Sequence, residues 1–285
     1  MSLHHITRES LPLHLLDKAQ GHKFSHGHAL VLSGGAGRSG AARLAARGAL
    51  RAGAGLVTLA VPPEAAPEVA AQITAVMMRT LTRPDDLRQQ LRDARINAVC
   101  IGPGVGIGRP QFELVQIALA SSRSLVLDAD ALTLVAQNRR LFSALHPGCL
   151  MTPHGGEFAR LFPDIAERMA SDAALSRAAA VQQAAERAGC VVLLKGAETI
   201  IADPDGQIAA HVADGARAVP WLATAGAGDV LAGMITGLIA RGIAPFTAAE
   251  LAVFLHVEAA AAVGPGLIAE DLPEALPAVL KALLT

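Results

Sequence analysis

The segment 223–233 has the sequence most suggestive of a reactive site, Ala-Thr-Ala-Gly-Ala-Gly-Asp-Val-Leu-Ala-Gly. A glycine-rich turn that enters a helix leaves backbone N–H groups free, and the helix dipole adds partial positive charge at the same place. The backbone of Gly226, Ala227 and Gly228 is therefore predicted to form an anion hole suited to a phosphoryl group.

A single acid, Asp229, stands at the lip of this predicted hole. A carboxylate repels phosphate, so Asp229 does not fit a phosphate ligand. It fits a base that takes the proton from a hydroxyl group attacking phosphorus. The alternative is an ordinary helix N-terminus, because Asp is favoured in the first turn of a helix whether or not it does chemistry.

Short apolar segments that alternate with helix-like segments must position this site. We expect strands at 29–32, 55–61, 98–101, 125–127, 150–151 and 191–194. Fully apolar strands between helices predict an α/β fold with a mostly parallel sheet covered on both faces. Nearly every strand is followed by Gly, Asp, His, Glu or Lys. Parallel strands bring their carboxyl ends to one edge, so these residues should converge there as a ligand site.

The remaining organisation is simple. Residues 199–212 alternate in polarity around the turn Asp203-Pro-Asp-Gly206, which predicts an antiparallel pair of strands. The chain after Asp229 is expected to be helical to its end. No internal repeat or linker interrupts residues 21–285, so we expect one domain there. Residues 1–20 are expected to form an N-terminal arm rather than core.

Two glycine-rich loops follow predicted strands. The loop 34–40 (Gly-Gly-Ala-Gly-Arg-Ser-Gly) resembles a dinucleotide-binding turn, but the next strand ends in Val61-Pro62 rather than in an acid. It also lacks the Gly-Lys-Ser/Thr of a phosphate-binding loop. We expect a loop whose backbone lies close to a ligand. The loop 102–106 (Gly-Pro-Gly-Val-Gly) is either a plain turn or a second close approach.

Polar residues at other strand ends suggest further contacts. His154 and Glu157 lie three residues apart, which places both on one face of a first helical turn. Glu157 and Asp128, with Asp130, could serve a hydrated Mg²⁺, although helix capping explains them equally well. Lys195 directly follows a buried strand, which favours a phosphate contact over a lysine that only reaches solvent. The other histidines, including His256, are interpreted as structural or surface residues.

Composition narrows the class of protein. The net charge of -1 and the 3% aromatic content, with no Tyr, argue against a nucleic-acid partner. The uncharged apolar run 230–240 is too short for a membrane span, and residues 1–9 lack the apolar core of a signal peptide. Cys100, Cys149 and Cys190 lack metal-ligand spacing. Buried free thiols and a cytoplasmic location are expected.

Taken in order, these motifs resemble the NAD(P)H-hydrate dehydratases of the ribokinase-like superfamily. The resemblance covers residues 20–285. It is carried by segments 34–41, 51–58, 102–106, 128–132, 152–157, 194–197 and 228–233. It implies a three-layer ribokinase-like sandwich that repairs hydrated nicotinamide cofactors. ADP would phosphorylate the hydroxyl of the hydrate (NADHX or NADPHX), and phosphate would then leave to give NADH or NADPH, AMP and phosphate.

The resemblance also implies residue roles. Ala41, Gly104, Gly106 and His154 would bind the hydrate together with Asp229, which would be the catalytic base. Glu157 would lie near Mg²⁺. The adenine nucleotide would contact the following residues: Lys195, Gly196, Ala197, Glu198, Thr199, Gly226, Ala227 and Gly228. Bacterial relatives are often tetramers, so a homo-oligomer is expected. A separate epimerase would be needed to interconvert the two hydrate epimers.

One departure from the family pattern concerns the turn before Asp229. The family usually has Gly-Gly-Thr/Ser-Gly-Asp, whereas this chain has Ala225-Gly-Ala-Gly-Asp. If position 225 needed a positive φ, its alanine would be strained. Two alternative functions follow: a kinase of the same superfamily acting on a small alcohol such as a thiamin precursor, and a catalytically silent nucleotide-binding protein. The retention of Asp229 and Lys195 argues against the silent protein.

Overall fold

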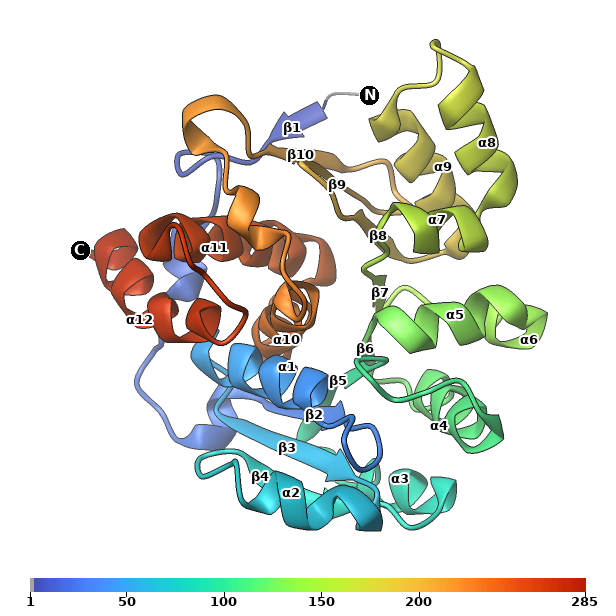
Figure 1. The fold of residues 1–285 in the computed structure, drawn as a ribbon, viewed down its shortest axis with the longest axis vertical. Helices are drawn as coiled ribbons and strands as arrows, with labels where there is room; N and C mark the ends of the chain where they lie inside the picture. Colours follow the sequence, from blue (N-terminus) through green and yellow to red (C-terminus); the bar gives the residue numbers. More distant parts are fainter. Residues whose placement is uncertain (1–2) are drawn as a thin grey trace.

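The computed structural model of the chain describes residues 3–285 and contains one ten-stranded sheet. The strands are β1 (Leu3–His5), β2 (His28–Leu32), β3 (Leu56–Val61), β4 (Met77–Thr80), β5 (Ile96–Ile101), β6 (Ser124–Leu127), β7 (Cys149–Met151), β8 (Val191–Leu194), β9 (Glu198–Ala202) and β10 (Ile208–Val212). Their spatial order is β1-β10-β9-β8-β7-β6-β5-β2-β3-β4 (Figure 1).

The central strands are parallel, as the sequence predicts. Each neighbouring pair from β8 through β7, β6, β5, β2 and β3 to β4 is parallel. Every residue of β2, β7 and β8 is buried, because helices cover both faces of the sheet. The carboxyl ends of β2, β5, β6, β7 and β8 therefore lie side by side at one edge. The predicted convergence of the chemical motifs is confirmed.

The predicted antiparallel extension is also present. β9 pairs antiparallel with both β8 and β10, and the turn between β9 and β10 lies at 203–207. The Asp203 carboxylate accepts hydrogen bonds from the backbone N–H groups of Asp205 (3.0 Å) and Gln207 (2.9 Å). An aspartate at the start of a turn commonly bonds to the backbone in this way, which closes the hairpin.

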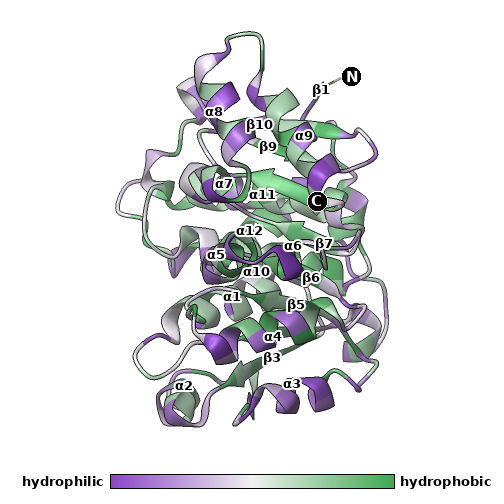
Figure 2. Cartoon of the chain, turned by 90° about the vertical axis from the view of Figure 1, so that its right-hand side faces the viewer, coloured by the Kyte–Doolittle hydropathy of each residue, from purple (hydrophilic) through white to green (hydrophobic). Residues whose placement is uncertain are grey.

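Helices form a layer on each face of the sheet (Figure 1). One face carries α1 (Gly40–Arg51), α10 (Ala227–Ala240), α11 (Pro245–Val263) and α12 (Asp271–Leu284). The other carries α3 (Pro84–Gln90), α4 (Arg109–Leu119), α5 (Ala129–Gln137), α6 (Arg139–Phe142), α7 (Gly155–Leu161), α8 (Pro163–Ser171) and α9 (Arg177–Ala188). The short helix α2 (Ala66–Ala70) lies beside β3 and β4. Figure 2 shows the apolar strands enclosed between helices with hydrophilic outer faces. This is the predicted three-layer α/β sandwich.

Within the described residues 3–285 there are also five short 3-10 turns: η1 (Leu13–Leu16), η2 (Lys23–His26), η3 (Pro63–Ala65), η4 (Gly215–Arg217) and η5 (Pro220–Leu222). The N-terminal segment differs from the expected arm. β1 pairs in parallel with β10, and Ile6, Leu11 and Leu16 are buried in the core on the α10 and α11 side. The expectation that residues 1–20 avoid the core is wrong for these three side chains, because their burial removes apolar area from water. A domain boundary at residue 20 stays a prediction.

Helix α11 is the most apolar long helix among the described residues. By length and composition alone, Pro245–Val263 is apolar enough to cross a membrane. However, 67% of its most apolar window is buried inside the molecule, and it contains Glu250 and Glu258. A core helix of a water-soluble protein passes the same test, so this helix is weak evidence for a membrane span.

Helices α1 and α10 pack in close backbone contact. A Cβ atom built on Gly233 would overlap the carbonyl oxygen of Ala45, and one built on Gly237 would overlap that of Ala49. Glycine on α10 and alanine on α1 therefore let the two backbones touch. This contact fixes the position of α10 in space. The first turn of α10 contains Asp229, so the position of that carboxylate is fixed as well.

We predict that Gly233→Ala destabilises the protein. Alanine is the better helix former by about 1 kcal/mol, but its methyl group would force the two helices apart, and such overpacking costs about 1–3 kcal/mol. The matched control is Gly155→Ala in α7, where an added Cβ has no neighbour within 4 Å. Urea denaturation measures both variants. A Gly233→Ala midpoint equal to or above that of the wild type would contradict this packing argument.

Candidate active site

The turn before α10 has the geometry that the anion hole requires. Gly226 is the N-cap of α10 with φ 91°, a left-handed conformation that favours glycine. Among residues 3–285, the only non-glycine residues with positive φ are Ser122 and Ala129, so Ala225 is not strained in this way. The N–H groups of Gly228 and Asp229 make no hydrogen bond within those residues, whereas the Ala227 N–H bonds weakly to the Thr224 carbonyl (3.4 Å). Two free donors thus face the strand edge.

Asp229 lies in the first turn of α10 and is partly buried. Burial and, after it, the negative charge of Asp128 raise the pKa of its carboxyl group to about 6, although Lys195 acts in the opposite direction. Asp130 and Glu157 also raise it. A carboxylate whose pKa is close to neutral can accept a proton and still be ionised at pH 7, which suits a general base.

Lys195 joins two parts of the site. Its Nζ lies 2.8 Å from Asp128 Oδ1, which also accepts a hydrogen bond from the Thr152 hydroxyl at 2.8 Å. The same Nζ is 3.3 Å from the position of a Cβ built on Gly228. The ammonium group therefore lies between a buried acid at the end of β6 and the anion hole. Asp128 is the N-cap residue of α5, but its side chain makes no capping bond, so the capping alternative is wrong for it.

His154 and Glu157 share the first turn of α7, as their spacing predicts. The Glu157 carboxylate accepts from the His154 N–H (2.8 Å), and His154 Nδ1 accepts from the Gly156 N–H (3.0 Å). This is a reciprocal capping box, so the structural alternative for this pair does occur. His154 Nε2 lies 3.5 Å from Glu157 Oε1, and 56% of the His154 side chain is exposed. The histidine is thus held in place yet accessible to a ligand.

The two glycine-rich loops touch each other. Gly104 has φ 65°, and a Cβ built on it would lie 2.7 Å from the Arg38 carbonyl oxygen and 3.6 Å from Ala41 Cβ. The Gly106 N–H donates to Asp130 Oδ2 at 2.8 Å. The structure therefore brings Ala41 and Gly104 together, and it gives Asp130 a role in holding the loop 102–106.

One cavity lies at the N-terminus of α10, and a second lies at the glycine loops. The first, about 500 Å³, is mostly apolar and is lined by Lys195, Gly196, Ala197, Thr199, Ala227 and Gly228, but not by Glu198 or Gly226. The second, about 630 Å³, is lined by residues of both glycine loops, including Gly35, Arg38 and Gly106. Ala41, Gly104 and His154 do not line it. Most of the predicted nucleotide-binding residues therefore surround one cavity.

The sequence did not predict that His256 contacts the candidate site. It is buried in α11, lines the first cavity, and its Nε2 lies 2.9 Å from the carbonyl oxygen of Ala227. Burial lowers its pKa to about 4, so the ring is neutral at pH 7 and can donate Nε2–H to that carbonyl. The surface alternative is wrong for His256. An isolated histidine in an apolar helix carries no pattern that would have shown this contact.

The three cysteines are buried and free, as expected. Burial raises the pKa of each thiol, so the thiols stay protonated. Within residues 3–285, no group of three or more His, Cys, Asp or Glu side chains could hold a metal ion. A Mg²⁺ bound here would therefore depend largely on phosphate oxygens and water, which is how this cation commonly binds with nucleotides.

Comparisons with known proteins agree with this geometry. A family model described as NAD(P)H-hydrate dehydratase matches residues 29–277. The ADP-dependent (S)-NAD(P)H-hydrate dehydratase of Xanthomonas campestris is 34% identical, covering 98% of this chain and 96% of that protein. The bifunctional NAD(P)H-hydrate repair enzyme Nnr of Moorella thermoacetica is 38% identical over 93% of this chain. The ADP/ATP-dependent NAD(P)H-hydrate dehydratase of Bacillus subtilis, co-crystallised with ATP/Mg²⁺, superposes with a TM-score of 0.78 at 27% identity, covering 99% of each chain.

The parallel sheet, its two helical layers and the anion hole at the strand edge define a ribokinase-like protein. Within that class, the chain belongs to the NAD(P)H-hydrate dehydratase family. It spans about half the length (51%) of the bifunctional relative from Moorella thermoacetica.

The pKa of Asp229 predicts the pH dependence of turnover. Below pH 6 its carboxyl group is mostly protonated and cannot accept a proton, so kcat should fall as the pH decreases through about 6. Asp229→Asn should lower kcat by roughly 10²–10⁴-fold and remove this acid limb, while ADP still binds to the backbone donors. Rates measured from pH 5 to 8 test this. Near-normal turnover in Asp229→Asn would reject the base assignment.

The position of Lys195 predicts its effect on nucleotide affinity. Lys195→Ala should raise the dissociation constant of ADP by roughly tenfold or more, because a charged hydrogen bond contributes about 1.5–3 kcal/mol. Trp221, the only tryptophan, belongs to the segment around this cavity, so its fluorescence offers a readout besides calorimetry. Arg140→Ala, at the exposed start of α6, is the control. An unchanged affinity of Lys195→Ala for ADP would show that Lys195 only pairs with Asp128 and does not contact the nucleotide.

Proposed function

We propose that this protein repairs hydrated nicotinamide cofactors, by ADP-dependent dehydration of (6S)-NADHX or NADPHX to NADH or NADPH with release of AMP and phosphate. The observation that supports this most is the meeting of Asp229, Lys195 and Gly228 at one strand edge. Such a group combines a base, a cation and free backbone donors, which phosphoryl transfer requires. Membership of the dehydratase family supplies the substrate class.

The first step transfers the β-phosphoryl group of ADP to the hydroxyl of the hydrated ring. Asp229 accepts the hydroxyl proton while the oxygen attacks phosphorus, and AMP leaves. The N–H groups of Gly228 and Asp229 and the Lys195 ammonium stabilise the charge on the transferring oxygens. The adenosine of ADP occupies the cavity beside Lys195, Gly196, Ala197 and Thr199, with Glu198 at its border.

The second step expels phosphate from the phosphorylated ring. The ring also loses a neighbouring proton, and the double bond of NADH or NADPH forms. Phosphate is a far better leaving group than hydroxide at neutral pH, which is why phosphorylation precedes dehydration. In this proposal Ala41, Gly104, Gly106 and His154 hold the hydrated ring close to Asp229. The contact of Gly104 with Ala41 and the exposure of His154 support that placement.

We propose that Mg²⁺ binds together with the nucleotide, where it would neutralise part of the negative charge of the phosphates. Glu157 and Asp128 are the residues that would hold its water shell. The chemistry of both fits, because Mg²⁺ prefers oxygen ligands. Each is also occupied within the protein, Glu157 by the His154 N–H and Asp128 by Lys195 and Thr152. A water-mediated contact leaves those bonds intact.

The alternatives receive less support. A small-alcohol kinase of the same superfamily would use Asp229 similarly but stop at the phosphorylated product. The relatives that are 34–38% identical carry the names of hydrate dehydratases or hydrate repair enzymes, which favours dehydration. A catalytically silent nucleotide-binding protein is disfavoured because the turn at Ala225 is unstrained and Asp229 keeps a pKa suited to a base.

The partners of the proposed reaction follow from its chemistry. Only one epimer of the hydrate is a substrate, so a separate NAD(P)HX epimerase would supply it from the other epimer. The relative from Moorella thermoacetica is named as bifunctional, which supports such a pairing. We further propose a cytoplasmic homo-oligomer, with a tetramer as its most favoured form. Exposed apolar side chains such as Trp221, Ile107 and Ile268 support self-association.

One assay tests the proposed function and its phosphoryl donor. Purified protein is mixed with hydrated NADH, Mg²⁺ and a nucleotide, and the absorbance of reduced nicotinamide is followed. We predict a faster rate with ADP than with ATP, because the reacting γ-phosphoryl of ATP lies one phosphate further from adenosine. A misplacement of ~1 Å can lower a rate about 10²-fold.

The two arms of this assay have separate meanings. Protein without nucleotide, and the Asp229→Asn variant with ADP, are the controls. No increase in absorbance with either purified nucleotide would reject the dehydratase. A faster rate with ATP would reject only the preference for ADP.

A further inference from the structure

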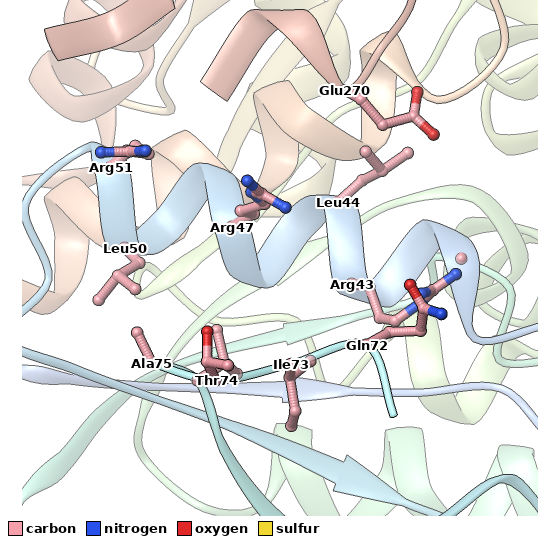
Figure 3. A pocket seen from close by; sticks show the side chains of 12 residues that line it. Arg43, Leu44, Arg47, Leu50, Arg51, Gln72, Ile73, Thr74, Ala75 and Glu270 are labelled. Carbon is pink, nitrogen blue, oxygen red and sulfur yellow. The ribbon is translucent and has the colours of Figure 1, made fainter. Parts of the chain in front are cut away.

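A third cavity, about 550 Å³ in volume, follows the outer side of α1 (Figure 3). One wall is α1 itself, and the other is the segment 72–76 that connects α2 to β4. In Figure 3 the side chains of Arg43 and Gln72 lie together at the end nearest the start of α1, and Leu50 and Ala75 face one another further along. We call this cavity the α1 groove. It thus has a polar end and an apolar stretch.

The cationic side chains along the α1 groove differ in their partners. Arg47 and Arg51 both form ion pairs with Glu274 of α12, at 2.8 and 2.6 Å. Arg43 forms no ion pair or hydrogen bond within residues 3–285, and its Nε atom is buried without a hydrogen-bond partner. A buried donor without a partner is unfavourable, so a ligand that accepts from Arg43 would gain affinity. Arg43 also carries a fixed planar set of donors suited to phosphate.

The α1 groove begins beside the glycine-rich loop 34–40 of the site already described. Gly40 and Arg43 line both the groove and a smaller cavity at Gly37 and Ser39, which lie in the same glycine-rich loop as the hydrate cavity residues Gly35 and Arg38. On its inner side, the groove residue Leu44 touches the anion-hole turn, since a Cβ built on Gly226 would lie 2.7 Å from Leu44 Cδ1. The groove therefore adjoins both the loop 34–40 and the anion-hole turn.

We propose that the α1 groove binds the adenylate half of the hydrated dinucleotide, with Arg43 and Gln72 on its phosphate oxygens and the apolar stretch against its adenine ring. This rests on the proposed function, because it concerns the same substrate. The ADP cavity is lined by different residues, so both nucleotides can be bound at once. Helix α1 from Gly40 to Arg51 is about 18 Å long at 1.5 Å per residue, which is long enough to follow an extended nucleotide.

Two further carboxylates bear on this assignment. Glu270 lines the groove, and Glu68 lies in the smaller cavity, where it accepts hydrogen bonds from the Gly37 N–H (2.9 Å) and the Ser39 hydroxyl (2.5 Å). Both would repel phosphate. Glu68 is held by these two donors and also attracts the Arg43 charge, so an anion on Arg43 would compete with it. Figure 3 shows Glu270 above α1, on the other side from Gln72. The polar end at Arg43 is thus the part of the groove suited to an anion.

The test compares two substrates that differ only in the proposed occupant. These are hydrated NADH and the hydrate of reduced nicotinamide mononucleotide, which lacks the adenylate half. The wild-type protein should have a kcat/KM at least tenfold higher for the dinucleotide. Arg43→Ala should lower that ratio by roughly ten- to hundredfold, the range for one lost charged hydrogen bond, without changing the KM for ADP. Ile73→Glu should lower it similarly by placing a negative charge in the groove.

Arg140→Ala is the matched control, because it removes an exposed arginine far along the chain at the start of α6. Unchanged ratios in Arg43→Ala and Ile73→Glu, with a normal KM for ADP that shows a folded site, would overturn the proposal. So would sedimentation showing that Ile73→Glu dissociates an oligomer while the ratio is kept, since a second copy would then cover the groove. A wild-type protein that dehydrates neither hydrate would reject the proposed function itself.

Discussion

The close contact of α1 and α10 is the constraint on which the site depends. Gly233 and Gly237 let α10 lie directly on Ala45 and Ala49, and Gly226 packs against Leu44 of the same helix. These contacts fix the axis of α10 and therefore the direction in which the N–H groups of its first turn point. The helix dipole and the free donors can act on a phosphoryl group only from this fixed position. Small residues here thus serve function through packing.

The charged side chains around Asp229 set its protonation behaviour. Asp128, Asp130 and Glu157 surround Asp229 with negative charge, and together with burial they raise its pKa to about 6. Lys195 offsets this repulsion and is itself held by Asp128. When a nucleotide enters, its phosphates bring more negative charge, so the lysine has two competing partners. An acid poised near neutrality and a cation between two anions are consistent with phosphoryl transfer followed by elimination.

Three cavities lie near the candidate site: the apolar cavity at Lys195, the cavity at the glycine loops, and the α1 groove. In the proposed reaction, the adenosine of the donor would occupy the apolar cavity on the β8 and α11 side and the hydrated ring would lie at the glycine loops, with the α1 groove beside the loop 34–40. Because α1 lines the groove and its Leu44 packs on the turn at Gly226, a single helix links the groove to the anion hole. His256 supports the same turn from the opposite side through the carbonyl of Ala227.

The fold class, the strand ends and most residues of the candidate site can be predicted from the sequence alone. Apolar strands, turn residues and glycine-rich helix starts are local signals, and the parallel sheet converts their order along the chain into one edge in space. The folded structure was needed to show that Asp128 binds Lys195, that His256 contacts Ala227, and that Arg43 Nε is buried without a hydrogen-bond partner. It also placed Ile6, Leu11 and Leu16 in the core. These outcomes depend on the distance between segments far apart in sequence, which local patterns do not encode.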